Sequence, residues 1–235
     1  MNKRIANFDV EIIRKSGLKN IYIRVKPPDG KITVSASPKV SNEVISNLII
    51  AKSEQIKKAQ ERIRSQERQT KREYISGETF YLWGRPYMLK VIRNGRRYHV
   101  ELMPDKIIFI VPEKSSFEGR KRALTEWYRE ELRGVVSKLI ARCAERVGVE
   151  FSGWNIRDMK TCWGTCNTKK RIILVNLQLV KKPFDCLEYV LIHELVHLLE
   201  RNHTKKFYAL VEKFCPNWRE SKRRLSSYPL DSIEQ

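Results

Sequence analysis

One stretch of the chain decides the interpretation of the whole sequence: residues 185–203 read DCLEYVLIHELVHLLERNH. Apolar residues recur along it with the period of an α-helix, which predicts a helix that packs into a hydrophobic core. The chain has only four histidines, and three of them, His193, His197 and His203, lie in this stretch. The fourth, His99, lies in a predicted strand, where a surface imidazole is the simpler interpretation.

His193 and His197 are four residues apart, which places both imidazoles on one face of a helix, one turn apart. Two imidazoles in that position can bind one cation, and zinc is the usual one. Glu194 projects about 100° around the helix axis from His193. It can reach a metal-bound water without being a ligand, and zinc lowers the pKa of such a water toward about 7. The pattern is therefore typical of a metal-dependent hydrolase in which Glu194 transfers the proton.

A catalytic zinc usually has three protein ligands and a water, so a third ligand is needed. His203 lies ten residues after His193, the spacing of the third histidine in metzincins. An unbroken helix would carry it about 15 Å along the axis, so we expect the helix to end and the chain to turn back. Metzincins have glycine at the position of Glu200, and Asn202 can take the left-handed conformation instead. Glu212 is the alternative third ligand, as in gluzincins, although we prefer His203.

The rest of the sequence predicts an α+β protein. We expect strands over 8–14, 19–26, 31–36, 98–102, 106–111, 155–160 and 171–175. We also expect strands within 75–92, broken by Gly77 and by Gly84-Arg85-Pro86. We expect helices from 42 to about 73, from 116 to 148, across the 185–203 stretch, over 204–215 and from 218 onward. Ser41 is an N-cap candidate for the first helix. The second begins at Ser116 and ends at Gly148. Asp185, with Glu188 three residues later, predicts a capping box for the helix that carries the histidines.

Two turns predict β-hairpins. Lys15-Ser16-Gly17 lies between the first two predicted strands, and Asn94-Gly95 follows the strands predicted within 75–92. The sequence displays no internal repeat. Residues 52–73 are mostly charged, which predicts an exposed helical connector with a basic face. We therefore divide the chain into a β-rich N-terminal region, 1–115, with a helical connector at about 42–73, and a catalytic domain, 116–235.

Composition limits the class of protein. The 235 residues are 41% hydrophobic, enough to form a core and to exclude global disorder. The chain has no run of 18 or more apolar residues, so we expect no membrane span and no membrane partner. Its first residues, MNKRIANFDVEIIR, lack the apolar run of a signal peptide. Five cysteines, an odd number, indicate reduced thiols, so we expect a cytoplasmic protein.

Four segments together resemble the YgjP-like metallopeptidases, a zincin family grouped near the SprT and WLM proteases. They are 159–166 (MKTCWGTC), 173–177 (ILVNL), 187–198 (LEYVLIHELVHL) and 202–207 (NHTKKF). Looser matches at 77–87 and 127–128 extend the resemblance over most of residues 20–227. The resemblance is most specific over 159–207, where the His-Glu-x-x-His pattern lies.

The resemblance implies an α+β fold with a zincin-like metallopeptidase core, an N-terminal β-rich part and long helices. It implies His193, His197 and His203 as the ligands of one Zn²⁺ per chain and Glu194 as the catalytic acid/base. The expected activity is hydrolysis of peptide bonds in a protein or peptide substrate, through a zinc-bound water that Glu194 activates. Cys162 stands where the family pattern has a basic residue, so a contact made from that position is not carried over.

Two other functions are compatible with the sequence. Forty-seven Lys and Arg against 27 Asp and Glu give a net charge of +20, which favours contact with polyanions. The chain can therefore be a nucleic-acid-associated protease that acts on DNA-bound protein, or a nucleic-acid module with a structural zinc, although it has no recognisable nucleic-acid-binding motif. A zinc hydrolase of a non-peptide amide would use the same site.

Other residues near the motif have simpler interpretations. Cys162 and Cys166 are predicted to be structural thiols, because no second Cys/His pair completes a metal site with them. The strand at 171–175 can be the edge along which an extended peptide pairs, or an ordinary core strand. Tyr189 and Tyr208 can donate to an oxyanion, or can simply be core or surface tyrosines.

Overall fold

The computed structural model describes residues 2–26, 30–65 and 72–227. The chain forms two compact units, Met1–Arg68 and Gln69–Gln235, and each is described by itself. Both units combine helices with mixed β-sheets, so the fold is α+β, as the sequence predicts. Across the described residues, we find no helix with both the length and the apolar character that crossing a bilayer requires.

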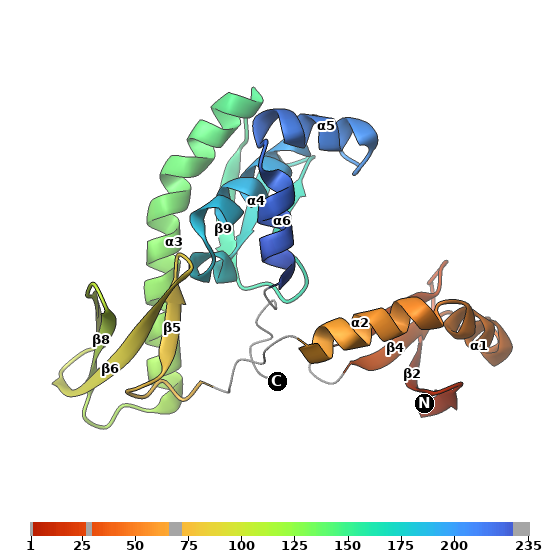
Figure 1. Cartoon of the computed structure of the whole chain (residues 1–235), viewed down its shortest axis with the longest axis horizontal. Helices are drawn as coiled ribbons and strands as arrows, with labels where there is room; N and C mark the ends of the chain where they lie inside the picture. Colours follow the sequence, from red (N-terminus) through yellow and green to blue (C-terminus); the bar gives the residue numbers. More distant parts are fainter. Residues whose placement is uncertain (1, 27–29, 66–71, 228–235) are drawn as a thin grey trace. The chain divides into compact units, whose positions relative to one another are not determined.

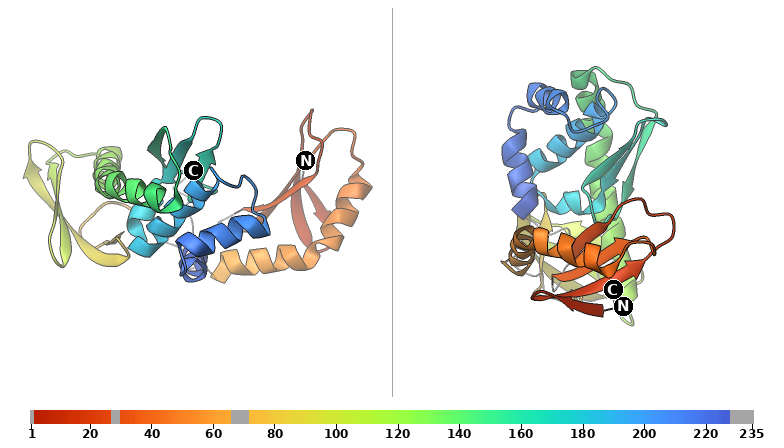
Figure 2. Two further views of the ribbon diagram at one scale, coloured as in Figure 1. Left: turned by 90° about the horizontal axis from the view of Figure 1, so that it is seen from above. Right: turned by 90° about the vertical axis from the view of Figure 1, so that its right-hand side faces the viewer.

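The first unit is a four-stranded sheet with two helices along one face (Figures 1 and 2). Its elements are β1 (Asn2–Ile5), β2 (Phe8–Arg14), β3 (Tyr22–Lys26), β4 (Lys31–Ala36), α1 (Asn42–Ala51) and α2 (Ser53–Ser65). Alternate residues of β2 and β4, such as Val10 and Val34, are buried beneath the helices. Ile45 and Ile49 of α1 and Ile56 of α2 complete this core. The sheet therefore has one covered face and one open face, as the alternation predicts.

The helix predicted from 42 to about 73 is two helices, interrupted at Lys52. Ser41 caps the first, as expected, because its hydroxyl accepts a hydrogen bond from the Val44 N–H. α2 is more than an exposed connector, because Ile56 is buried in the core of the first unit. The boundary between the two units lies within the predicted connector, whose residues 66–71 lie outside the described part of the chain.

The turn at Lys15-Ser16-Gly17 does not form a hairpin, so that prediction is wrong. The sheet order is β1-β2-β4-β3: β2 pairs with β4 in parallel, and β3 pairs with β4 antiparallel. The Lys15 N–H donates to the Ala36 carbonyl, so the chain is still held by β4 where β2 ends. A type I′ hairpin turn needs positive φ at two adjacent residues, and of these three only Gly17 has it. The hairpin partner of β2 is β1, a strand that the sequence analysis missed.

The second unit begins with another four-stranded sheet, made of β5 (Thr79–Leu82), β6 (Arg85–Gly95), β7 (His99–Leu102) and β8 (Lys106–Pro112). The hairpin predicted at Asn94-Gly95 is wrong, because β8 lies between β6 and β7 in the order β5-β6-β8-β7. Neither Asn94 nor Gly95 has the positive φ that a type I′ turn requires. The predicted pairing of the next two strands, β7 and β8, is confirmed.

The two four-stranded sheets repeat one topology, although the sequence displays no repeat. Each has an antiparallel hairpin, a parallel central pair and an outer antiparallel strand, in the same order. Ile12 pairs with Val34 in the central pair of the first sheet, and Val91 pairs with Phe109 at the matching place in the second. The repeat therefore lies in the backbone pairing, and the side chains that fill it differ.

The remainder of the second unit holds a three-stranded sheet and five helices. They are α3 (Phe117–Val147), β9 (Gly153–Arg157), β10 (Gly164–Asn167), β11 (Ile172–Asn176), the 3₁₀ helix η1 (Leu177–Lys181), α4 (Phe184–Val196), α5 (Lys205–Phe214) and α6 (Trp218–Ser227). Ser116 caps α3 through its hydroxyl, and Gly148, with a φ of 74°, ends it, as predicted. The sheet order is β10-β11-β9, with β11 parallel to β9 and antiparallel to β10.

One hydrophobic core runs through the second unit. α3 is 31 residues long and extends from the β5–β8 sheet to α4 (Figure 1). The core includes Phe109 of β8, Leu124 and Leu139 from the two halves of α3, and Leu191 of α4. The domain boundary predicted near residue 115 lies inside this unit. That all catalytic residues lie after this boundary stays a prediction.

Candidate metal centre

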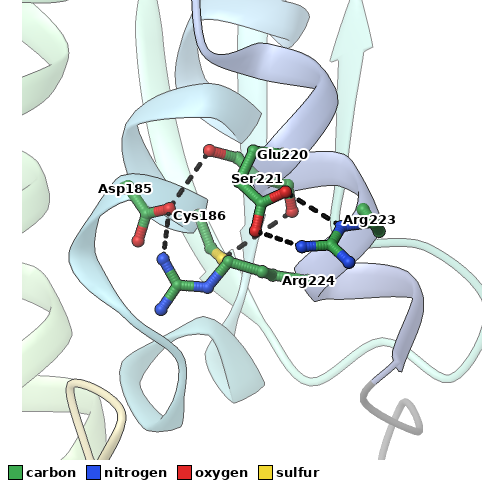
Figure 3. Close-up of polar contacts among 6 residues, drawn as sticks. All are labelled: Asp185, Cys186, Glu220, Ser221, Arg223 and Arg224. Atoms are coloured by element: carbon green, nitrogen blue, oxygen red, sulfur yellow. Dashed lines mark hydrogen bonds and ion pairs between the residues drawn. The ribbon is translucent and has the colours of Figure 1, made fainter.

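α4 is buried on nearly every side, which explains its almost uniformly apolar sequence. Its N-cap is Pro183, with no side-chain cap bond, so the capping box predicted for Asp185 and Glu188 is wrong. The Asp185 carboxylate instead accepts hydrogen bonds from the Ser221 hydroxyl (3.2 Å) and the Arg224 guanidinium (2.9 Å), as Figure 3 shows. These contacts fix α6 against the first turn of the helix that carries the histidines.

The three histidines predicted as ligands come together because the chain turns back where α4 ends. The ring centroids are 5.1 Å apart for His193 and His197, 4.9 Å apart for His193 and His203, and 4.8 Å apart for His197 and His203. One ring nitrogen from each histidine lies within 4.8 Å of the other two. Nowhere else in the described chain do three His, Cys, Asp or Glu side chains converge in this way.

The turn that returns His203 to the helix uses no left-handed residue. The N–H groups of Leu199 and Glu200 both donate to the Val196 carbonyl at 2.9 Å, which closes the helix end. Neither Glu200 nor Asn202 has positive φ, so the left-handed residue predicted at Asn202 is wrong. Because the turn needs no positive φ, a glutamate is tolerated at the position that metzincins give to glycine.

The three imidazoles suit a cation. His197 Nδ1 lies 3.3 Å from the Glu200 carbonyl oxygen and, as the donor of that bond, leaves the Nε2 lone pair free. The Nε2 atoms of His193 and His203 are 2.9 Å apart, near the separation of about 3.3 Å between two nitrogens bound tetrahedrally to zinc. Burial, followed by the imidazoles of His197 and His203, lowers the pKa of His193 to about 3. Three imidazoles with converging nitrogens are a ligand set that fits zinc.

Glu194 lies beside the triad in a buried position, with 6% of its surface exposed. Burial raises the pKa of its carboxyl to about 8, and a cation held by the neighbouring His193 would oppose that shift. A Cβ atom on Gly164 would lie 2.8 Å from the Glu194 Cγ and 2.9 Å from its Oε1. Only glycine therefore lets the first residue of β10 come so close to this carboxylate.

Asn176 organises the loop before β10, and the sequence analysis missed its role. Its buried amide nitrogen donates to the carbonyls of Met159 (2.8 Å) and Cys162 (2.7 Å). Its backbone N–H donates to the Trp163 carbonyl at 3.0 Å. The loop that leads to β10 is thereby held at both ends. The signal in the sequence is an amide that ends the otherwise apolar segment 172–176.

Aromatic rings of α5 pack against the triad, and the sequence analysis gave one of them, Phe207, no role. The centroid of the buried Phe207 ring lies 4.9 Å from His193, 4.6 Å from His197 and 4.7 Å from His203. Phe207 therefore packs against all three imidazoles at once. Tyr208, the next residue, stacks on His203 with centroids 6.0 Å apart and planes at 25°.

Two predicted alternatives lie away from the triad. The Glu212 carboxylate accepts a hydrogen bond from the Trp218 indole (3.3 Å) and pairs with Arg219. It does not belong to the group of converging ligand atoms. His99 lies on β7, where its ring is 3.2 Å from the Glu101 carboxylate. The structure thus gives both residues other partners.

The remaining candidates lie near the site without joining it. Cys162 and Cys166 are free thiols outside the converging group. Burial, followed by the Glu194 carboxylate, raises the pKa of Cys166 to about 11, so this thiol stays protonated near neutral pH. The Tyr189 ring lies 5.7 Å from the His193 ring, and burial raises the pKa of its phenol. Oxyanion donation by Tyr189 or Tyr208 stays a prediction.

The strand predicted at 171–175 is β11, the middle strand of the three-stranded sheet. The core-strand interpretation is confirmed, and the edge-strand interpretation is wrong for this segment. The edge beside α4 belongs to β10, which in the described residues pairs with β11 alone. β10 begins at Gly164, so a free strand edge starts beside Glu194.

A mixed sheet packed against a helix with converging histidines defines a class, the metallopeptidases of zincin type, and comparison with known proteins agrees. The family model described as YgjP-like, metallopeptidase domain, matches residues 19–228. The chain belongs to the YgjP-like metallopeptidase family. The comparison with curated proteins finds no match.

Among the solved structures that match part of the chain is the crystal structure of the metallopeptidase zymogen abylysin of Pyrococcus abyssi. The two chains are 25% identical, and the match covers 38% of this chain and 90% of that one, with a TM-score of 0.36. A spatial likeness at that level carries no argument about the site.

Proposed function

We propose that the chain is a zinc-dependent peptidase in which His193, His197 and His203 hold one Zn²⁺ and Glu194 is the catalytic acid/base. The observation that carries the proposal is the convergence of three imidazoles beside a buried carboxylate. Membership of a metallopeptidase family supports hydrolysis of peptide bonds. The all-nitrogen ligand set supports zinc as the ion.

The chain's own residues account for the proton transfers. A zinc ion held by the three imidazoles would act as a Lewis acid and would lower the pKa of a water beside it toward about 7. Glu194 accepts a proton at its carboxylate from the attacking water and returns a proton to the nitrogen of the departing amine. The bond from His197 Nδ1 to the Glu200 carbonyl holds that ring in orientation. Gly164 covers the Glu194 carboxylate and limits its exposure to bulk water.

The substrate we propose is a peptide in extended form along β10. The backbone groups on the free edge of a strand can pair with an added strand, which binds a peptide without dependence on its side chains. The free edge of β10 starts at Gly164, beside Glu194. A peptide paired there would pass the carboxylate that transfers the proton.

Metal content tests the ligand set. We expect about one zinc per chain in the wild-type protein and a large loss in His203→Ala, measured by elemental analysis of proteins prepared identically. His99→Ala is the matched control, because it removes the one histidine outside the triad and should leave the zinc in place. Retention of zinc by His203→Ala would refute the three-histidine site.

Hydrolysis tests the role of Glu194. We expect Glu194→Gln to keep its zinc and to lose hydrolysis of a quenched fluorescent peptide by about 10²- to 10⁴-fold, the usual contribution of a general acid/base. Glu212→Gln is the control, because Glu212 pairs with Arg219 outside the triad. An active Glu194→Gln protein would refute the assigned role. Loss of zinc in Glu212→Gln would restore that residue as the third ligand.

A further inference from the structure

α6 carries four cationic side chains, and one of them differs from the other three in its partners. Three of them pair with carboxylates, two as drawn in Figure 3. These pairs are Arg219 with Glu212, Arg223 with Glu220, and Arg224 with Asp185. Lys222 is exposed and has no carboxylate partner among the described residues. Its positive charge is therefore not neutralised by an ion pair there.

The Lys222 ammonium lies over an aromatic stack that leads to the triad. Its Nζ is 5.3 Å from the Tyr208 ring centroid and 5.4 Å from that of Trp218. Those two rings stack with centroids 5.3 Å apart and planes at 21°. The other neighbour of Tyr208 is His203, stacked at 6.0 Å. Lys222 also contributes to the lowered pKa of His193, which supports a position within electrostatic range of the proposed metal ligands.

This setting keeps the ammonium in place without satisfying its charge. A cation above aromatic faces gains about 0.5–1 kcal/mol at an exposed site, which orders the side chain. An anion can still approach the ammonium from solvent, because the aromatic rings carry no net charge and therefore do not neutralise it. His203 and Lys222 are both exposed and both contact the Tyr208 ring, so both can be reached from solvent beside the same ring.

We propose that Lys222 forms a subsite that binds a carboxylate of the substrate beside the three histidines. The inference rests on the proposed function, since it needs a peptide bound at the triad. The carboxylate can be an acidic side chain near the scissile bond or the C-terminus of the peptide, because both present the same charged group. The preferred substrate is then a peptide with a negative charge on the α6 side of the cleavage site.

Lys213 provides a matched control on the neighbouring helix. It too is a lysine whose Nζ lies over an aromatic ring, at 5.2 Å from the Phe214 centroid. It is not among the groups that lower the pKa of His193 or His197. Replacing Lys213 therefore removes the same charge and the same kind of ring contact without removing a charge beside the triad.

The experiment measures binding without cleavage. Zinc-loaded Glu194→Gln protein is titrated with fluorescently labelled peptides of one neutral sequence, and binding is followed by anisotropy at low salt. In one series a single glutamate replaces glutamine at successive positions and the C-terminus is amidated. In a second arm the neutral peptide has a free C-terminal carboxylate. The two arms distinguish an acidic side chain from the chain terminus.

We expect at least one carboxylate-bearing peptide to bind more tightly than its neutral counterpart, by roughly two- to fivefold for an exposed ion pair. Adding Lys222→Gln should abolish that preference and leave binding of the neutral peptide unchanged. Lys222→Arg should restore it, and Lys213→Gln should have no effect. Added salt should weaken the preference, because exposed charges are screened.

Three results would overturn the proposal. One is equal binding of acidic and neutral peptides, and another is a preference that survives Lys222→Gln. The third is an equal loss for all peptides in Lys222→Gln, which would mean that the lysine only supports the Tyr208–Trp218 stack. Failure of the proposed function is seen separately, as zinc retained by His203→Ala or hydrolysis retained by Glu194→Gln. If those variants behave as proposed, a missing carboxylate preference refutes the subsite alone.

Discussion

The two four-stranded sheets have the same strand order and the same parallel and antiparallel pairings, yet the helices that follow them differ. After β4 the helical segment is interrupted at Lys52, and its two parts, α1 and α2, cover their own sheet. After β8 the single helix α3 continues for 31 residues, and its later turns enter the core that contains α4. The second sheet is therefore part of the unit that holds the candidate metal centre, and the first is not.

The difference lies in the buried stripe of the helix that follows each sheet. α3 continues to bury apolar residues beyond the sheet, including Leu132, Val136 and Ile140. α2 buries Ile56 in the first unit's core, while the described residues that flank it are mostly exposed or half-buried. Strand order alone does not decide whether a sheet forms a small separate unit or shares the hydrophobic core of a larger one. The length of the apolar stripe on the next helix decides it.

The largest effects should come from truncating that stripe. Leu132→Ala removes a buried side chain of α3 and should lower the free energy of unfolding of the second unit by about 2–5 kcal/mol. Ile49→Ala in α1 should cost a similar amount in the first unit and leave zinc content unchanged. Hydrogen exchange resolved by segment measures each unit. Loss of protection in both units from either variant would contradict their separation.

Removing the metal should also affect one unit only. With free zinc at 100 times its dissociation constant, binding adds about 2.7 kcal/mol to stability, because the ligands converge only in the folded state. Chelation should therefore lower the melting temperature of the second unit and leave that of the first unchanged, as read by scanning calorimetry. The His193→Ala protein is the control, since chelation should change nothing further there. A shift in the first unit's transition would place a metal in that unit as well.

The hairpin turns of the two sheets provide a smaller test. Gly84 has a φ of 80°, and a Cβ there would lie 2.8 Å from the Pro183 Cγ at the start of α4. Gly84→Ala should cost about 1–3 kcal/mol and lower activity by shifting the ligand helix. The matching turn of the first sheet has Ala6 at a φ of 52°, so Ala6→Gly should be neutral or stabilise by up to about 1 kcal/mol. Denaturant unfolding measures both, and a harmless Gly84→Ala would mean that the turn does not support α4.

The smallest effect should be a gain. Gly134 lies on the exposed side of α3, and a Cβ there would meet no atom within 4 Å. Gly134→Ala should stabilise the second unit by about 0.5–1 kcal/mol, because alanine favours the helix interior. Urea unfolding measures it, with Gly164→Ala as the contrasting variant that should lower activity. A destabilised Gly134→Ala protein would indicate that α3 needs to bend at this residue.

Local features of the fold could be predicted from the sequence, and strand partners could not. The cap at Ser41, the start of α3 at Ser116 and its end at Gly148 follow from neighbouring residues, and they are confirmed. Both hairpin predictions fail, because a third strand inserts between the two that the turn connects. That choice depends on contacts between residues far apart in the chain, which periodicity does not report. Asp185 is mistaken for a cap for the same reason, since its partners lie on α6.

In the candidate site too, some residues could be predicted from the local sequence and others could not. The two helical histidines and Glu194 are fixed by spacing within one helix, so the sequence could name them, although their roles as ligands and acid/base stay predictions. Asn176, Gly164 and Phe207 act through contacts with other segments of the chain. All three lie in the segments that carry the family resemblance, but their local sequence does not indicate those contacts. A lone amide in an apolar strand is the one signal that could have identified Asn176.

The position of His203 has a consequence for biosynthesis. Every strand of the described fold precedes His203 in the chain, as do α3 and α4, and a ribosome delivers residues in that order. Both sheets and most of the core can therefore form while the triad still lacks its third imidazole and the Phe207 ring that packs against all three. If the triad carries the peptidase activity, a nascent chain cannot cut itself or its neighbours before its framework exists. The order of residues alone thus delays hydrolysis until the protein is nearly assembled.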